Sequence, residues 1–92
     1  MVKRKFKMNE KRILEELIEV LQSQGIEIRS DFFGGTGGGL CVVKDKKIFF
    51  IDTDATAAEN AAKCAQAVLE SVDIDTIYIK PDVREFLEKV KN

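Results

Sequence analysis

The chain has 92 residues, of which 45% are hydrophobic and 34% charged, and a formal net charge of −1. This length and composition predict one folded domain with a single modest core. The absence of histidine excludes His-based acid–base catalysis, Cys–His and Ser–His nucleophiles and His-ligated zinc sites. No apolar run approaches the ~20 residues that a membrane-spanning helix needs, so no membrane partner is predicted.

The charges are unevenly distributed along the sequence. Residues 1–12 carry six basic and one acidic side chain (+5), whereas residues 13–92 carry nine basic and fifteen acidic side chains (−6). No apolar stretch follows the first basic residues, so they do not form a secretory signal, and we expect a cytoplasmic protein. We predict a basic flexible arm over residues 1–8 and one domain over residues 9–92. No basic or aromatic surface continues the arm into the domain, which disfavours nucleic-acid binding.

The first predicted element is an amphipathic helix over residues 10–24. Asn9 can cap its start, and Gly25 suits the left-handed position that follows a helix end. Its apolar side chains recur at offsets of three and four residues: Ile13, Leu14, Leu17, Ile18 and Leu21. Residues 26–33 then alternate between apolar and polar side chains, which predicts a half-buried strand.

Two further strands are predicted after a run of glycines. Residues 40–44 and 47–52 are short apolar stretches, and the charged residues 44–47 make the turn between them. Three consecutive strands with short links predict a three-stranded antiparallel meander. Residues 76–80 also alternate and can add a short fourth strand.

Two more helices complete the predicted α+β fold, in which the helices pack on one face of the sheet. Thr53, Asp54 or Thr56 can cap the second helix, which ends near residue 71 or 72 and has a buried face made mostly of alanine and cysteine. Pro81 suits the first turn of a C-terminal helix. The predicted order is therefore helix, antiparallel meander, helix, short fourth strand and helix.

The glycine run is one candidate site and comprises Gly34, Gly35, Thr36, Gly37, Gly38 and Gly39. It leads into a strand and has neither a following Gly-Lys-Ser/Thr nor the spacing G-x-G-x-x-G, which disfavours a phosphate cradle. A connection that uses positive φ angles is the simpler interpretation. Five glycines in six positions nevertheless exceed what a turn needs. Binding of a small ligand or nucleotide by this backbone is therefore our alternative hypothesis.

The phenylalanines carry the main functional hypothesis. Phe32 and Phe33 are adjacent, as are Phe49 and Phe50, so each pair places one ring on each face of a sheet. If helices cover one face only, the rings on the other face are left for a partner or a second copy. We predict a non-catalytic interaction module that self-associates or binds a protein partner through its sheet, with Phe33, Phe49 and Phe50 at the interface.

The remaining reactive side chains do not indicate an enzyme. Asp52 and Asp54, with Asp31 nearby, could hold a divalent cation, but Asp54 is also a natural helix cap, and we predict no metal site. Cys41 and Cys64 are expected to be buried as small apolar groups. Cys41 has no sequence neighbour that would activate its thiol. No catalytic residue and no cofactor is predicted.

Two resemblances follow from these motifs. The segments Gly38-Gly39-Leu40-Cys41 and Ile79-Lys80-Pro81-Asp82-Val83-Arg84 look like motifs shared by a family of small uncharacterised bacterial proteins, a resemblance that implies no activity. The order helix, hairpin, helix is similar to the core of zincin metallopeptidases of the ImmA/IrrE type, whose helix after the hairpin carries His-Glu-x-x-His. Here that place reads Ala58-Glu59-Asn60-Ala61-Ala62, with alanine at both histidine positions. This second resemblance implies a metal-free scaffold kept for binding.

Overall fold

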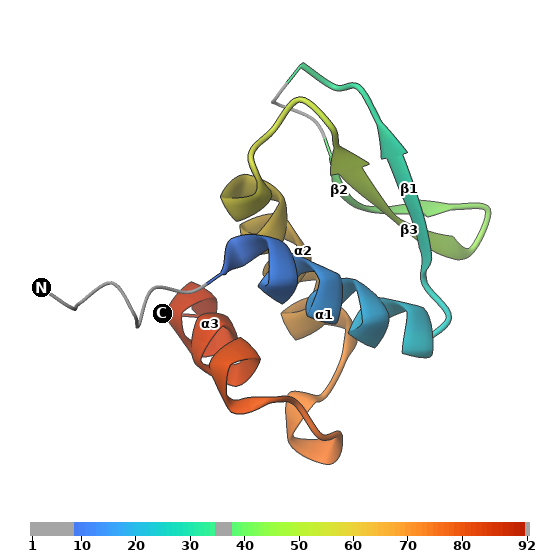
Figure 1. The fold of residues 1–92 in the computed structure, drawn as a ribbon. Helices are drawn as coiled ribbons and strands as arrows, with labels where there is room; N and C mark the ends of the chain where they lie inside the picture. The colour runs from blue at the N-terminus through green and yellow to red at the C-terminus, as the bar shows by residue number, and fades with distance from the viewer. Residues whose placement is uncertain (1–8, 35–37, 92) are drawn as a thin grey trace, which may run out of the picture.

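The computed structural model describes residues 9–34 and 38–91 (Figure 1). The predicted basic arm over residues 1–8 and three residues of the glycine run, Gly35, Thr36 and Gly37, lie outside the described residues. The elements in chain order are α1 (Glu10–Ser23), β1 (Glu27–Asp31), β2 (Gly39–Val43), β3 (Lys46–Asp52), α2 (Ala57–Ser71), the short 3₁₀ helix η2 (Ile74–Thr76) and α3 (Pro81–Lys91). The fold is α+β, with three α-helices and one three-stranded sheet among the described residues.

Local capping signals explain the helix ends. The side chain of Asn9 accepts a backbone hydrogen bond of 3.1 Å at the start of α1, and Gly25 follows that helix with φ of 81°. Thr56 caps α2 in a capping box with Glu59, in which each side chain accepts the other residue's backbone N–H. Pro81 is the first residue of α3, as predicted.

The sheet is mixed, so the predicted antiparallel meander is wrong. Its strand order is β1-β3-β2, with β1 parallel to β3 and β2 antiparallel to β3. The prediction treated the glycine run over residues 34–39 as a link between neighbouring strands, but β1 and β2 lie on opposite sides of β3. Lys44 and Asp45, with φ of 51° and 67°, form the tight turn that keeps β2 beside β3.

The predicted fourth strand is also not present in the described residues. Ile74–Thr76 forms η2, and residues 77–80 pair with no described strand. The alternation does appear in burial, because Tyr78 is 81% exposed and Ile79 only 6%. This segment lies on the far side of the helices from the sheet, where no strand edge is within reach (Figure 1).

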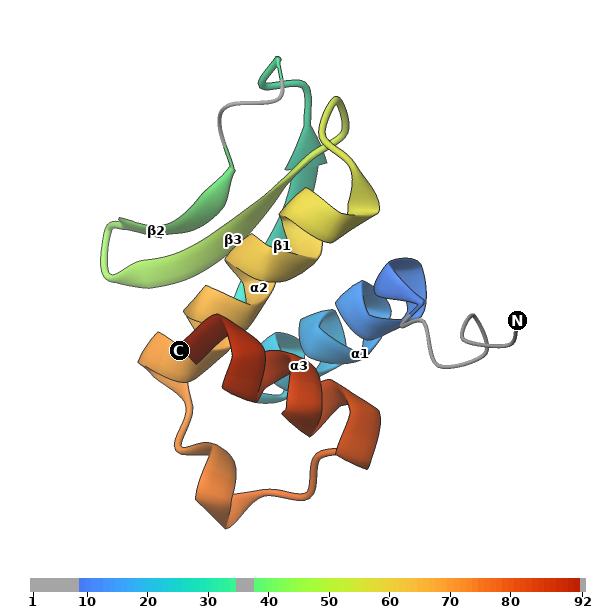
Figure 2. The same ribbon diagram turned by 90° about the vertical axis from the view of Figure 1, so that its left-hand side faces the viewer.

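Helix α2 is central to the packing, since it contacts α1, α3, β2 and β3. Ala61, Cys64, Ala65 and Val68 on its inner face are fully buried, and these small side chains let the neighbouring elements approach closely. Helices α1 and α2 lie on one face of the sheet, and α3 packs beyond them (Figure 2). The core is completed by larger side chains from α1, α3 and β3: Ile13, Leu17, Leu21, Phe49, Val83 and Leu87. Burying each such side chain contributes about 1.5–3 kcal/mol.

Candidate functional site

A buried carboxylate, Asp52, organises the end of β3 where the chain crosses the sheet. Asp52 is 1% exposed, and its Oδ1 accepts the backbone N–H of Phe33 at 3.1 Å and that of Asp54 at 2.8 Å. One side chain therefore fixes both the segment that leaves β1 and the turn that leaves β3.

Asn60 joins helix α2 to the same strand end. Its side-chain oxygen accepts the backbone N–H of Asp52 at 3.1 Å, and its amide nitrogen donates to the carbonyl oxygen of Asp52 at 2.8 Å. Asn60 is 5% exposed, so this pair of hydrogen bonds satisfies two backbone groups that water does not reach readily. Sequence reasoning missed this pair. Its only signal was a polar residue on the otherwise apolar face of α2.

The described glycines of the run, Gly34, Gly38 and Gly39, all have positive φ angles, of 71°, 92° and 113°. A Cβ at Gly38 would lie 3.0 Å from the carbonyl oxygen of Phe50, so glycine is needed there for close packing on β3. A Cβ at Gly39 would meet no atom within 4 Å. Close approach within the fold therefore explains Gly38, whereas Gly39 borders open surface.

The hollows of the described surface include the following two. One of about 270 Å³ lies between the start of β2 and helix α2, and it is lined by Gly38, Gly39, Leu40, Lys63, Gln66, Ala67 and Glu70. It does not include the start of α2, where the N–H of Glu59 is already bonded to the hydroxyl of Thr56. The other hollow, of about 190 Å³, lies between α1 and the segment that leads into α3, next to the 2.9 Å ion pair of Lys80 with Glu16.

The sheet face turned away from the helices, here called the open face, brings together two of the three predicted aromatic interface residues. Phe49 points into the core and is fully buried, so it offers no surface to a partner. Phe50 lies on the open face, and the ring of Phe33 packs edge-on against it with centroids 5.7 Å apart. Ile48, on the same face by alternation, is only 4% exposed.

Charged side chains cover the β1 side of the open face. Glu27 accepts a 2.6 Å hydrogen bond from Arg29 Nε and lies 3.5 Å from Lys46 Nζ. The hydrogen bond from Arg29 lowers the pKa of Glu27. Arg29 is the register partner of Phe50, and Glu27 is the partner of Ile48. The charged side chains of β1 therefore shield the neighbouring Ile48 and Phe50 on that side of the open face.

Strand β2 has no such shielding at its edge of the sheet. Its sequence, Gly39–Val43, contains no charged residue, and Val42 and Val43 are 64% and 47% exposed. Phe32, which directly follows β1, is 70% exposed. Among the described residues, the most exposed large hydrophobic side chains are these three and Tyr78, so most of them lie in or beside the sheet.

The two cysteines have different environments. Cys64 is fully buried in α2 as expected, and burial raises its pKa from 9.0 to about 12. Cys41 is exposed, so the expectation of burial was wrong for this residue. It pairs with Ile48 across the ladder and therefore shares the open face, which no described helix covers.

Asp31 and Glu59 accept backbone hydrogen bonds within their own segments. Asp31 Oδ1 accepts the backbone N–H of the next residue, and Asp54 is exposed. Over residues 9–34 and 38–91, no group of three or more His, Cys, Asp or Glu side chains is placed to hold a metal ion. Glu59, in the segment over residues 58–62, accepts the backbone N–H of Thr56 at 3.0 Å as part of the helix cap.

None of the described helices is long and apolar enough to cross a membrane. The chain matches no protein-family model, no curated protein and no solved structure.

Proposed function

We propose that this protein is a non-catalytic interaction module that associates through its sheet, primarily with a second copy of itself. The observation that carries the proposal is the gathering of exposed apolar side chains around the sheet: Phe32, Val42 and Val43, next to the Phe33–Phe50 pair. Phe50 and, by alternation, Val43 lie on the sheet face away from the described helices, whereas Val42 lies on the helix side at the exposed edge. Exposed apolar side chains grouped in this way mark association sites on soluble domains.

The ionisable side chains of the interior support binding rather than catalysis. Asp52 is the one buried carboxylate in the described part of the chain, and it holds backbone N–H groups in place. Cys64 has its pKa raised to about 12 by burial, which keeps its thiol protonated and unreactive at neutral pH.

Replacement of Phe50 by lysine tests the proposal. We expect native mass spectrometry and sedimentation to give a dimer for the wild type and a monomer for Phe50→Lys, because association would bury an unpaired charge. Tyr78→Lys is the matched control, since Tyr78 is 81% exposed and lies between η2 and α3, outside the sheet. Circular dichroism checks that both variants fold. A wild type that stays monomeric at every concentration contradicts the proposal.

A small-ligand role for the glycine run is the second candidate. It is favoured by the hollow of about 270 Å³, in which the backbone of Gly38 and Gly39 lies beside the side chain of Lys63. The same native spectra separate the two functions, because a monomer that carries extra mass would identify a bound molecule. Lys63→Ala should then remove the added mass without unfolding the domain.

A further inference from the structure

We propose that two copies of the chain pair edge to edge through β2, antiparallel and centred on Cys41, so that their two sheets become one. This inference rests on the proposed self-association and assigns it to one edge, one direction and one register. Antiparallel pairing of identical strands is a two-fold arrangement, in which every contact occurs twice.

The two sheet edges differ in a way that selects β2. Strand β1 carries Glu27, Arg29 and Asp31 on alternate positions, and charges of this kind block the addition of another strand. Strand β2 has no charge, no proline and no recorded break in its pairing with β3. A strand added at this edge would bury the exposed valines, and an uncharged strand such as β2 of a second copy can do so without burying a charge.

The register follows from the sizes of the side chains on the open face. With Cys41 at the centre, Gly39 lies opposite Val43 of the second copy. A Cβ at Gly39 would meet nothing within 4 Å, so this position offers room for a valine that is 47% exposed in the single chain. Because Gly39 pairs with Phe50 on β3, Val43 of the second copy extends the apolar surface formed by Phe33 and Phe50.

The same register also matches side chains on the helix side of the sheet. Leu40, which packs on the core, lies opposite Val42 of the second copy. Val42 is 64% exposed in the single chain, and Leu40 lines the hollow of about 270 Å³ between β2 and α2. Pairing therefore moves an exposed valine towards the mouth of this hollow, where Ala67 adds apolar surface.

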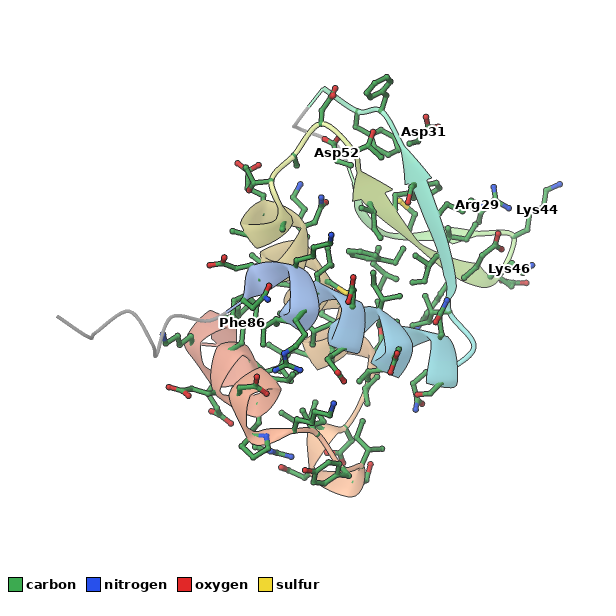
Figure 3. All side chains as sticks on the ribbon, in the orientation of Figure 1. Arg29, Asp31, Lys44, Lys46, Asp52 and Phe86 are labelled. Atoms are coloured by element: carbon green, nitrogen blue, oxygen red, sulfur yellow. The ribbon has the colours of Figure 1, made fainter. Side chains whose placement is uncertain are left out.

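The charges at the two ends of the sheet determine the direction. The turn between β2 and β3 and the first residues of β3 carry three lysines and one aspartate, whereas Asp31 lies at the opposite end of the sheet (Figure 3). The exposed residues concerned are Lys44, Asp45, Lys46 and Lys47 at the first end and Asp31, Asp54 and Glu59 at the second. Antiparallel pairing places the basic end of each copy beside the acidic end of the other, whereas parallel pairing would place like charges together.

Val42→Lys separates edge pairing from contact between open faces. Val42 lies on the helix side of the sheet, so edge pairing buries this side chain and stacking of the open faces does not. We expect Val42→Lys to raise the dimer dissociation constant at least about tenfold, measured by sedimentation over a concentration series. Tyr78→Lys should leave the constant unchanged, and circular dichroism should show that both variants fold.

Chemical cross-linking reads the register directly. The pairing places the Cys41 side chains of the two copies opposite each other on one face, so a short bis-maleimide should join them. Cys41→Ser should abolish the cross-link. Cys64→Ala should retain it, because Cys64 is fully buried and unavailable to the reagent.

The outcomes distinguish this inference from the proposed function. A dimer that Phe50→Lys dissociates, but that survives with its cross-link in Val42→Lys, overturns the edge pairing and leaves sheet association standing. A dimer that Val42→Lys dissociates but that never cross-links through Cys41 overturns the register. A wild type that is monomeric throughout overturns both proposals.

Discussion

Burial gives the two thiols of this chain different chemical access. Cys64 has an exposure of 0% on the inner face of α2, and moving a thiolate out of water into that environment is what raises its pKa to about 12. Cys41 is exposed on an edge strand. A thiol reagent therefore reaches Cys41 in the folded protein, whereas Cys64 reacts only after local or global unfolding exposes it.

The raised pKa of Cys64 predicts that stability declines at alkaline pH. Between pH 9.0 and about 12, the unfolded thiol loses its proton while the folded thiol keeps it. The unfolded state then binds fewer protons, so the free energy of unfolding falls by at most about 1.4 kcal/mol per pH unit. Urea unfolding across this range should show the wild type losing stability relative to Cys64→Ala. A constant difference would mean that the thiol ionises equally in both states.

Among the elements, β3 is the central strand of the sheet, and Gly38, which precedes β2, packs closely against it. A Cβ at Gly38 would lie 3.0 Å from the carbonyl oxygen of Phe50, whereas a Cβ at Gly39 would have open space. Both glycines have positive φ angles. They therefore share the cost of placing a side chain in that conformation, but only one of them would also clash.

Alanine at the two positions should separate these costs. We expect Gly38→Ala to destabilise the domain by at least about 1 kcal/mol more than Gly39→Ala, because only the first adds a clash with the backbone of β3. Urea denaturation measures the difference. The comparison is best made in the Val42→Lys background, so that association does not contribute. Equal destabilisation would show that conformation alone requires glycine at both positions.

The helices could be predicted from sequence because their signals are local. Asn9, Gly25 and Pro81 each act within one turn of the helix end that they define. The strand order could not be predicted in this way, since it depends on contacts between distant residues. The bond from Phe33 N–H to the carboxylate of Asp52 is one example, and it leaves no pattern in the sequence.

The candidate site was predictable in part for the same reason. Adjacency implied that one of Phe49 and Phe50 faces outward, but only the placement of the helices shows that it is Phe50. The bond between Asn60 and the backbone of Asp52 joins a helix to a strand end, and no spacing rule announces it. The bare edge at β2 became visible only when β3 proved to be the central strand.

For the molecule as a whole, a net charge of −1 conceals a separation of charge along the sheet. One end of the sheet carries Lys44 and Lys46, and the other end carries Asp31 (Figure 3), with Asp54 and Glu59 near the start of α2. A domain of this kind has a dipolar surface, which attracts a copy of itself only in the orientation that brings opposite ends together.

Salt should therefore weaken the dimer. Exposed charges are screened over about 10 Å at 0.1 M ionic strength, so the dissociation constant should rise several-fold between low and high sodium chloride. Sedimentation at a series of salt concentrations measures this dependence. At low salt, Lys44→Glu should also raise the dissociation constant, because it removes one of the positive charges at the basic end. A dimer that salt strengthens would show that apolar contact outweighs the end charges.

The position of β3 between its two neighbours also determines the order in which the sheet can be made. The turn at Lys44 and Asp45 joins β2 to β3 through the shortest link in the sheet, whereas β1 pairs with a strand that comes later in the chain. During synthesis, α1 and β1 therefore leave the ribosome before their partner exists. Because closing the larger loop carries the larger entropic cost, we expect the hairpin to form the folding nucleus and β1 to dock last.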